Sequence, residues 1–358
     1  MIQLSQKFTF SMEKKALLGK TLQELKEIVK GLGLPGFTAQ QIADWLYKKE
    51  VNSIDKMTNL SLKNRKILNE RYTFGTGEYL NFQESVDGTR KYLFPALGGK
   101  FIEAAYIPES SRKTLCVSSQ VGCKMGCLFC MTGKQGFQGN LSAGEIINQI
   151  RSLPERESLT NIVYMGMGEP LDNTEEVLKS LDILTSDWGF AMSPRRITVS
   201  TIGMLPGMKS FLENSECHLA ISLHTPFDDE RKKLMPVENI YPLKEVMSEI
   251  KKYNWFRQRR ISFEYIMFKD LNDTGRHVNE LSRLLSGVKC RVNLIRFHPI
   301  PDTPLEGTAD PEIEDFKNKL NDKGITATIR KSRGEDILAA CGLLSTKEML
   351  KQEKEEDF

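Results

Sequence analysis

The feature that most constrains the fold is an alternation, from residue 114 onward, of short apolar runs with amphipathic stretches long enough for helices. Six such runs occur: TLCVSS, NIVYMG, RRITVST, HLAISLH, RRISFEYIM and CRVNLIRF. Strands that alternate with helices predict βα units and a parallel sheet, and runs apolar on both faces suit strands covered on both sides. Six units favour an α/β fold built as an open partial (βα)6 barrel over a closed eight-stranded one.

Polar and glycine-rich motifs follow these strand runs. They are Ser118 with Ser119, MGMGEP, STIG, SLHTP and FHPIP. Ligands of such folds bind at the carboxyl ends of the parallel strands. We therefore expect the functional site where these motifs meet.

The chain divides by pattern into four parts. Residues 1–75 predict a small helical domain with apolar positions at helical spacing, including a helix over residues 39–49 that Thr38 caps. Residues 76–113 alternate as a β-meander linker, residues 114–345 form the barrel core, and residues 346–358 form a charged, frayed tail. Residues 1–72 carry 13 basic and 7 acidic side chains. This excess is a weak indication of a polyanionic partner, and a merely solvated helical surface explains it too.

The composition indicates the cellular compartment in which the protein acts. No run of eighteen apolar residues occurs, and the first fifteen residues carry charges where a signal peptide needs its apolar stretch. We expect a cytoplasmic protein without a membrane partner. Seven cysteines suit no disulfide framework, and four of them lie within residues 116–130, which in a reducing cytosol indicates a metal or a catalytic role.

The strongest motif is the C-x3-C-x2-C loop formed by Cys123, Cys127 and Cys130 directly after the first barrel strand. Structural zinc takes four protein ligands, and no second cysteine pair lies nearby. Three thiolates can instead hold three irons of a [4Fe–4S] cluster and leave the fourth iron open for a reactant. A zinc loop and a cluster used only for electron transfer remain the alternatives.

With Phe129 before its last cysteine, this loop resembles that of the radical S-adenosylmethionine (SAM) superfamily. The resemblance implies a partial (βα)6 barrel in which SAM chelates the open iron. It also implies that one-electron reduction, from a donor such as flavodoxin or ferredoxin, cleaves SAM to a 5'-deoxyadenosyl radical. A non-catalytic iron–sulfur protein that serves RNA binding or redox is the rival interpretation.

Further motifs make the chain similar to the RlmN and Cfr family of RNA adenine methyltransferases over about residues 20–345. They are TLCVSSQVGC, GCLFCMTGKQGF, MGMGEPLDN, SPRRITVSTIG, SLHTP, NLIRFHPIP and RGEDILAACG. RlmN enzymes methylate carbon 2 of an adenine in 23S rRNA, and many also modify tRNA, whereas Cfr enzymes methylate carbon 8. The basic N-terminal domain and the unbroken VGC and GEPLDN segments favour RlmN and an RNA rather than a DNA partner.

The family resemblance also assigns two further cysteines. Carbon 2 of adenine is too electron-poor to attack the methyl of SAM, so the family first methylates a cysteine and then makes a radical on that methyl, which consumes two SAM molecules. Cys341 matches the methyl carrier, and Cys116 matches the partner that releases the product through a transient disulfide. A buried structural role is the alternative for each. Cys217 and Cys290 are interpreted as core residues.

The remaining site residues are also implied by matching motifs. The resemblance places seven SAM contacts at strand ends: Gly168, Glu169, Ser200, Ser222, Leu223, His224 and His298. His298 departs from the family pattern, which has asparagine there, but either side chain can donate a hydrogen bond. Glu103 matches the proposed proton acceptor, and its alternative is a solvated strand glutamate.

Overall fold

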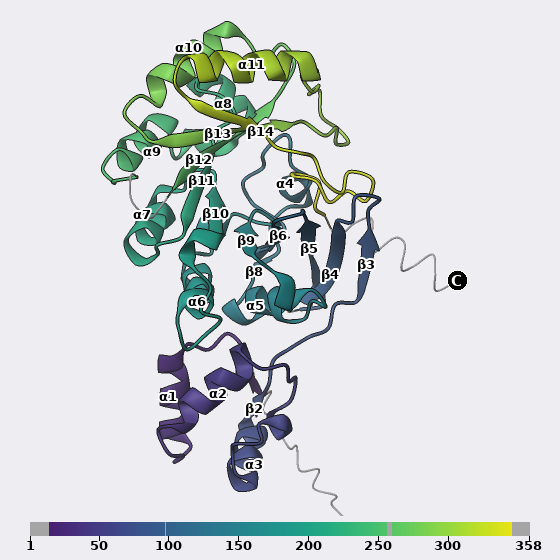
Figure 1. The fold of residues 1–358 in the computed structure, drawn as a ribbon, viewed down its shortest axis with the longest axis vertical. Coiled ribbons are helices and arrows are strands. Elements are labelled where there is room, and N and C mark those ends of the chain that lie inside the picture. The colour runs from purple at the N-terminus through teal and green to yellow at the C-terminus, as the bar shows by residue number, and fades with distance from the viewer. Residues whose placement is uncertain (1–13, 97, 256–259, 346–358) are drawn as a thin grey trace, which may run out of the picture.

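The computed structural model describes residues 14–96, 98–255 and 260–345, so the predicted tail over residues 346–358 lies outside the described residues (Figure 1). All six predicted strands form, as β6 (Lys113–Cys116), β9 (Asn161–Tyr164), β10 (Ile197–Thr201), β11 (His218–Ser222), β12 (Ile261–Met267) and β13 (Cys290–Arg296). They pair in parallel in chain order, which confirms the radical SAM type of α/β fold. A seventh parallel strand, β14 (Thr326–Ile329), follows β13 and was not predicted.

The predicted meander continues the barrel sheet. Its strands β3 (Asn81–Glu84), β4 (Arg90–Ala96) and β5 (Lys100–Pro108) pair antiparallel, and β5 pairs with β6. The result is one ten-stranded sheet in the order β14-β13-β12-β11-β10-β9-β6-β5-β4-β3. Residues 76–113 are therefore an extension of the sheet as well as a link between domains.

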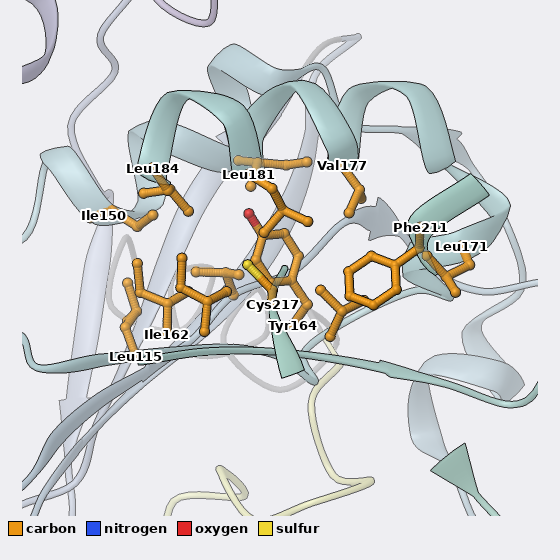
Figure 2. Packing of buried hydrophobic residues seen from close by; sticks show 14 of the residues in the cluster. Leu115, Ile150, Ile162, Tyr164, Leu171, Val177, Leu181, Leu184, Phe211 and Cys217 are labelled. Carbon is orange, nitrogen blue, oxygen red and sulfur yellow. The ribbon is translucent and has the colours of Figure 1, made fainter. Parts of the chain in front are cut away.

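Helices cover the outer face of the sheet. They are α5 (Ala143–Arg151), α6 (Thr174–Thr185), α7 (Leu205–Asn214), α8 (Asp228–Leu234), α9 (Leu243–Ile250), α10 (Gly275–Leu284) and α11 (Asp310–Asp322). Figure 2 shows α6 laying Leu181 and Leu184 over Ile162 and Tyr164 of the sheet. Cys217 is fully buried in this layer, as expected of a core residue. No helix among the described residues is long and apolar enough to cross a membrane.

The N-terminal domain contains α1 (Leu22–Gly31), α2 (Thr38–Tyr47) and α3 (Leu62–Arg71), joined by the short pair β1 (Lys15–Ala16) and β2 (Tyr72–Thr73). The predicted cap at Thr38 is wrong, because Thr38 begins α2 and Phe37 occupies the cap position without a side-chain hydrogen bond. Thr38 donates its backbone N–H to Pro35 O at 2.9 Å and buries its side chain in the domain core. Burial has therefore overridden the capping preference of threonine.

The N-terminal domain docks tightly on α5 and α6. Gly19 has φ +86°, and a Cβ there would lie 2.2 Å from the backbone nitrogen of Gly144. The backbones of these two segments are therefore in direct contact. The Arg151 guanidinium donates to Lys49 O at 2.8 Å, and Lys179 lies 3.2 Å from the Glu24 carboxylate. These contacts join the domain to the barrel through one continuous hydrophobic core.

A buried arginine fastens the strand ends on the side of the cluster loop. Arg231 of α8 is fully buried, pairs with Glu238, and donates to Ile202 O (2.7 Å), Ser222 O (3.1 Å) and Leu223 O (3.3 Å). These carbonyls follow β10 and end β11, so one guanidinium joins two strand ends to α8. Removing one partner of a buried ion pair leaves an uncompensated charge, which costs several kcal/mol.

We predict that Glu238→Gln lowers the free energy of unfolding by about 3 kcal/mol or more, because it leaves the Arg231 charge unpaired in the core. The matched control is Glu280→Gln, which removes the half-buried partner of the exposed Arg283 and should change stability by less than about 0.5 kcal/mol. Urea unfolding followed by circular dichroism measures both. Equal losses of unfolding free energy in the two variants would show that the buried Arg231–Glu238 pair does not stabilise the strand ends.

Candidate active site

The three motif cysteines lie on one loop between β7 (Gln120–Val121) and α4 (Met131–Gln135). Gly122 begins the loop with φ +69°, and a Cβ there would lie 1.7 Å from Gly136 O, so only glycine fits. Leu128 N donates to Leu234 O at 2.9 Å, which attaches the loop to the end of α8. The structure thus holds Cys123, Cys127 and Cys130 on one wall of a cavity of about 150 Å³.

The arrangement of the cysteine thiols on this wall suits a cluster of several irons, because the buried thiols would need a positively charged metal group beside them in order to ionise. Burial raises the pKa of Cys123 to about 12 and that of Cys127 well above its usual value, and the neighbouring thiols raise both further. Among the described residues, no group of three His, Cys, Asp or Glu side chains surrounds the position of a single metal ion. A [4Fe–4S] cluster presents a different iron to each cysteine, so its ligands spread over a wider shell.

Five of the seven predicted SAM contacts line the same cavity as the cysteines: Gly168, Glu169, Ser200, Ser222 and His224. Gly168 has φ +97°, and a Cβ there would lie 2.5 Å from the Gln120 side chain. Leu223 is different, because its side chain is buried in the core while its N–H donates to Glu264 O at 3.0 Å. The strand ends therefore meet at the cluster loop as expected, with Leu223 supporting them from behind.

Glu169 joins two of these strand ends. Its carboxylate accepts hydrogen bonds from Leu171 N and Ile202 N, each at 3.0 Å, while its own N–H donates to the Gln120 side chain. Burial raises the pKa of the Glu169 carboxyl to about 7, although the donated hydrogen bonds oppose this rise. A cationic ligand such as the ammonium group of SAM would return this pKa toward its ordinary value.

His224 has an unusual backbone and a defined protonation state. Its φ is +59°, uncommon for a residue with a Cβ, and its ring lies edge-on to Phe129 with centroids 4.7 Å apart. Nδ1 accepts a hydrogen bond from Ile266 N at 3.0 Å, so the proton of the neutral ring is assigned to Nε2. Burial lowers the pKa of His224 to about 3, which keeps the ring neutral.

A second cavity of about 350 Å³ adjoins the first and is lined by both Cys116 and Cys341. Cys116 is buried on β6, and burial followed by the nearby Cys341 thiol raises its pKa to about 12. Cys341 is exposed and lines the cluster cavity as well, as does Cys130. The two cavities are therefore neighbours, and Cys341 lines both.

The segment that carries Cys341 follows β14 and is attached at several points (Figure 1). Gly334 and Gly342 have φ of +64° and +84°, conformations that favour glycine. Met131 N donates to Gly342 O at 2.8 Å, and the Ser85 hydroxyl donates to the Asp336 carboxylate at 2.6 Å. We define residues 330–345 as the carrier loop.

Glu103 lies beneath the end of the carrier loop. It shares a face of β5 with Ala105, which pairs with Cys116, and neither cavity has Glu103 among its described lining residues. One carboxylate oxygen accepts Ser345 N at 2.9 Å, and the other lies 3.6 Å from the Lys91 ammonium. Burial raises the pKa of Glu103 to about 7, while Lys91 and Ser345 oppose this rise. Glu103 is thus a buried glutamate, not a solvated one.

His298 lies apart from the predicted SAM contacts. It lines the second cavity, where Nε2 is 3.1 Å from the Ser332 hydroxyl and Nδ1 is 3.3 Å from the Glu335 carboxylate. Burial lowers its pKa below the ordinary value. Both contacts belong to the carrier loop, so the structure gives His298 a role in holding that loop.

Comparisons with known proteins agree with this geometry. Residues 117–281 match the model of the radical SAM superfamily, and residues 15–73 match the N-terminal domain of the ribosomal RNA large subunit methyltransferases. A dual-specificity RNA methyltransferase RlmN from Nitratiruptor is 41% identical, over 93% of this chain and 98% of that protein. A probable dual-specificity RlmN from Parabacteroides distasonis is 58% identical, over 93% of this chain and 97% of that protein. The chain belongs to the RlmN family.

A solved structure supports the same assignment. A radical SAM methyltransferase from Sphaerobacter thermophilus superposes with a TM-score of 0.86 at 39% identity, over 92% of this chain and 99% of that one. As an RlmN-type radical SAM RNA methyltransferase, the chain is an enzyme, which excludes the non-catalytic interpretation. The cysteine wall and the strand-end motifs fit the cluster and SAM that the superfamily requires.

Arg330 was missed by the sequence analysis. Its guanidinium lies 3.3 Å from the Glu264 carboxylate and 3.5 Å from Met165 Sδ, and it lines both cavities. The neighbouring Cys341 thiol raises the pKa of Arg330, which therefore stays charged. Arg330 directly follows β14, so recognising the TATI run as a strand would have marked it as a strand-end residue.

We predict that anaerobic reconstitution gives one [4Fe–4S] cluster and that Cys123→Ala, Cys127→Ala and Cys130→Ala each abolish it, because every thiol of the wall carries one iron. Iron and sulfide analysis with electron paramagnetic resonance measures this. Cys217→Ala, which removes a thiol from the hydrophobic core, is the control and should retain the cluster. One equivalent of zinc without iron would contradict the assignment.

Proposed function

We propose that this enzyme methylates carbon 2 of an adenine in 23S rRNA, and also in tRNA, through a methylated Cys341. The observation that carries the proposal is that Cys341 and Cys116 line one cavity of about 350 Å³, and that Cys341 also lines the neighbouring cluster cavity. This volume lies within the range of cavities that bind small molecules, so a nucleoside can be admitted. The curated relatives named RlmN favour carbon 2 over the carbon 8 of Cfr enzymes.

Cys341 is the proposed carrier of the methyl carbon that is transferred to the adenine. Its exposed thiol, beside the charged Arg330, takes a methyl group from one SAM and forms S-methylcysteine. When bound, the cluster supplies the electron that cleaves a second SAM to a 5'-deoxyadenosyl radical, which removes a hydrogen atom from that methyl. The Cys341 methylene radical then bonds to carbon 2, so enzyme and RNA are joined covalently. The unpaired electron of this adduct would return to the bound cluster, which gave up one electron to cleave SAM.

Cys116 and Glu103 are proposed to release the RNA. The Cys116 thiolate attacks the Cys341 sulfur, so a disulfide forms while the carbon–sulfur bond breaks and its electron pair returns to the adenine. Glu103 accepts the proton from carbon 2, and the former methylene carbon gains a proton to become the methyl group. A thiol reductant then restores both cysteines. Ala339 of the carrier loop packs in one small buried cluster with Ala105 and Cys116, which supports this pairing.

The proposed partners follow from the same scheme. The basic N-terminal domain contributes RNA affinity through phosphate contacts. An electron donor such as flavodoxin or ferredoxin reduces the cluster. Incubation with 23S rRNA or tRNA, followed by nucleoside mass spectrometry against carbon 2 and carbon 8 methyladenosine standards, tests the function. Carbon 8 product alone, or no product from active protein, would overturn it.

We predict opposite effects for the two cysteines. Cys341→Ala should form neither adduct nor product, because the carbon has no carrier. Cys116→Ala should accumulate a covalent enzyme–RNA species that survives denaturing electrophoresis, because nothing attacks the Cys341 sulfur. Normal turnover by Cys116→Ala, or adduct formation by Cys341→Ala, would show that the roles are assigned wrongly.

We also predict that product release accelerates as the pH rises through about 7. Burial raises the pKa of Glu103 to about 7, so its carboxyl holds a proton below that pH and can accept one only above it. Glu103→Gln should slow release by about 10²-fold or more and remove this pH dependence. Single-turnover decay of the adduct between pH 6 and 8.5 is the measurement. An unchanged profile in Glu103→Gln would exclude Glu103 as the acceptor.

A further inference from the structure

The barrel has a third cavity, of about 640 Å³, that the proposed reaction does not use. It lies at the amino-terminal ends of the strands, opposite the cluster loop, where β11, β12, β13 and β14 begin. Closed barrels fill this region with branched apolar side chains. Here the strands contribute hydrogen-bonding residues instead: Thr198, Ser262, Asn293, Thr326 and Thr328. We call this space the base cavity.

The rim of the base cavity is basic. Arg260 precedes β12, Lys289 precedes β13, and Arg291 lies in β13, while Arg112 approaches from the turn before β6. Neither Arg260 nor Arg291 has a carboxylate partner among the described residues. Arg112 is 3.5 Å from a carboxylate, but both side chains of that pair are substantially exposed, which makes it a weak interaction.

Little negative charge opposes this rim. Glu264 is the single carboxylate among the described residues that line the base cavity, and it is already engaged by Arg330 at 3.3 Å. A recess lined by one sign of charge concentrates the electric field and attracts ions of the opposite sign. Ser262 and Asn293 also donate to Glu264, at 2.9 and 2.8 Å. The base cavity is therefore suited to an anion that binds at its basic rim.

The base cavity adjoins the cavity of the two cysteines. Both are lined by Arg112, Val163, Met165 and Arg330. A molecule with one group beside Cys341 can therefore extend into the base cavity. A polynucleotide is such a molecule, since it carries a phosphate next to every base.

We propose that the base cavity binds backbone phosphates of the single RNA strand that flanks the target adenine, with Arg260 and Arg291 as phosphate contacts. This rests on the proposed function, because the adenine beside Cys341 sets where the flanking strand can run. Phosphate contacts fix the register of a nucleic acid without reading its sequence. The base cavity would thereby hold the adenine against the carrier loop while Cys341 moves.

The test compares Arg260→Gln/Arg291→Gln with Arg283→Gln/Lys319→Gln, which removes the same charge from the outer helices α10 and α11. The probe is a fluorescent RNA hairpin with the target adenine in its loop, titrated at several salt concentrations. Each lost single-strand phosphate contact lowers the slope of log K against log salt by about 0.7. We expect about tenfold weaker binding and a slope reduced by about 1.4 in the first variant only. Unchanged binding and slope would overturn the proposal.

A second arm locates the phosphates. Hairpins with one neutral methylphosphonate at each position near the adenine should bind the wild-type enzyme less tightly at the contacted phosphates. The same replacements should have no further effect on Arg260→Gln/Arg291→Gln, because the interaction is already lost. Equal losses in both proteins at every position would contradict the proposed contacts.

Two controls separate this inference from the proposed function. Cluster content and methylation of Cys341 by SAM without RNA should be the same in wild type and in Arg260→Gln/Arg291→Gln, which verifies folding. If wild-type enzyme makes methylated RNA while the variant binds RNA normally, only the base-cavity proposal fails. If wild-type enzyme makes no methylated adenine, the proposed function fails independently of the binding result.

Discussion

The buried guanidinium of Arg231 is the interaction on which the site depends. It binds carbonyl oxygens at the ends of β10 and β11 and is neutralised by Glu238. The helix that carries it ends at Leu234, whose carbonyl receives Leu128 N of the cysteine loop. A planar side chain with five donors can serve several carbonyls at once, which a lysine cannot. The cysteine wall and the strand-end motifs are thus positioned by one charged residue without a solvent contact.

The site combines fixed and movable parts in a way that the proposed chemistry requires. Cys116 lies on a strand inside a ten-stranded sheet, so its sulfur has little freedom. Cys341 is exposed on the carrier loop, which contains two glycines in the left-handed region. A group that must meet SAM, then an adenine, then another thiol needs such a loop. Because Ser345 N is held by Glu103, the same loop also reaches the proposed base.

Much of this arrangement could be predicted, because the periodicity and spacing of apolar residues in the sequence depend directly on which side chains are buried. Six apolar runs gave six parallel strands, and the motifs behind them met at the cysteine loop. The features that were not predicted have local causes. The strand β14 reads TATI, too short and too polar to be recognised, so Arg330 was missed with it. The SAM contact of His298 stays a prediction. Its contacts with Ser332 and Glu335 depend on tertiary structure and could not be derived from the motif.

The pleat of strands β4, β5 and β6 limits which insertions the sequence can accept in β5. Lys91, Glu103, Ala105 and Cys116 share one face of β4, β5 and β6, because Ala105 is opposite both Lys91 and Cys116. Successive residues of a strand alternate between its faces, so one inserted residue between Glu103 and Ala105 would turn the carboxylate outward unless a bulge absorbed it. An insertion of two residues keeps the carboxylate on the face of Cys116, whereas an insertion of one keeps it there only with a bulge.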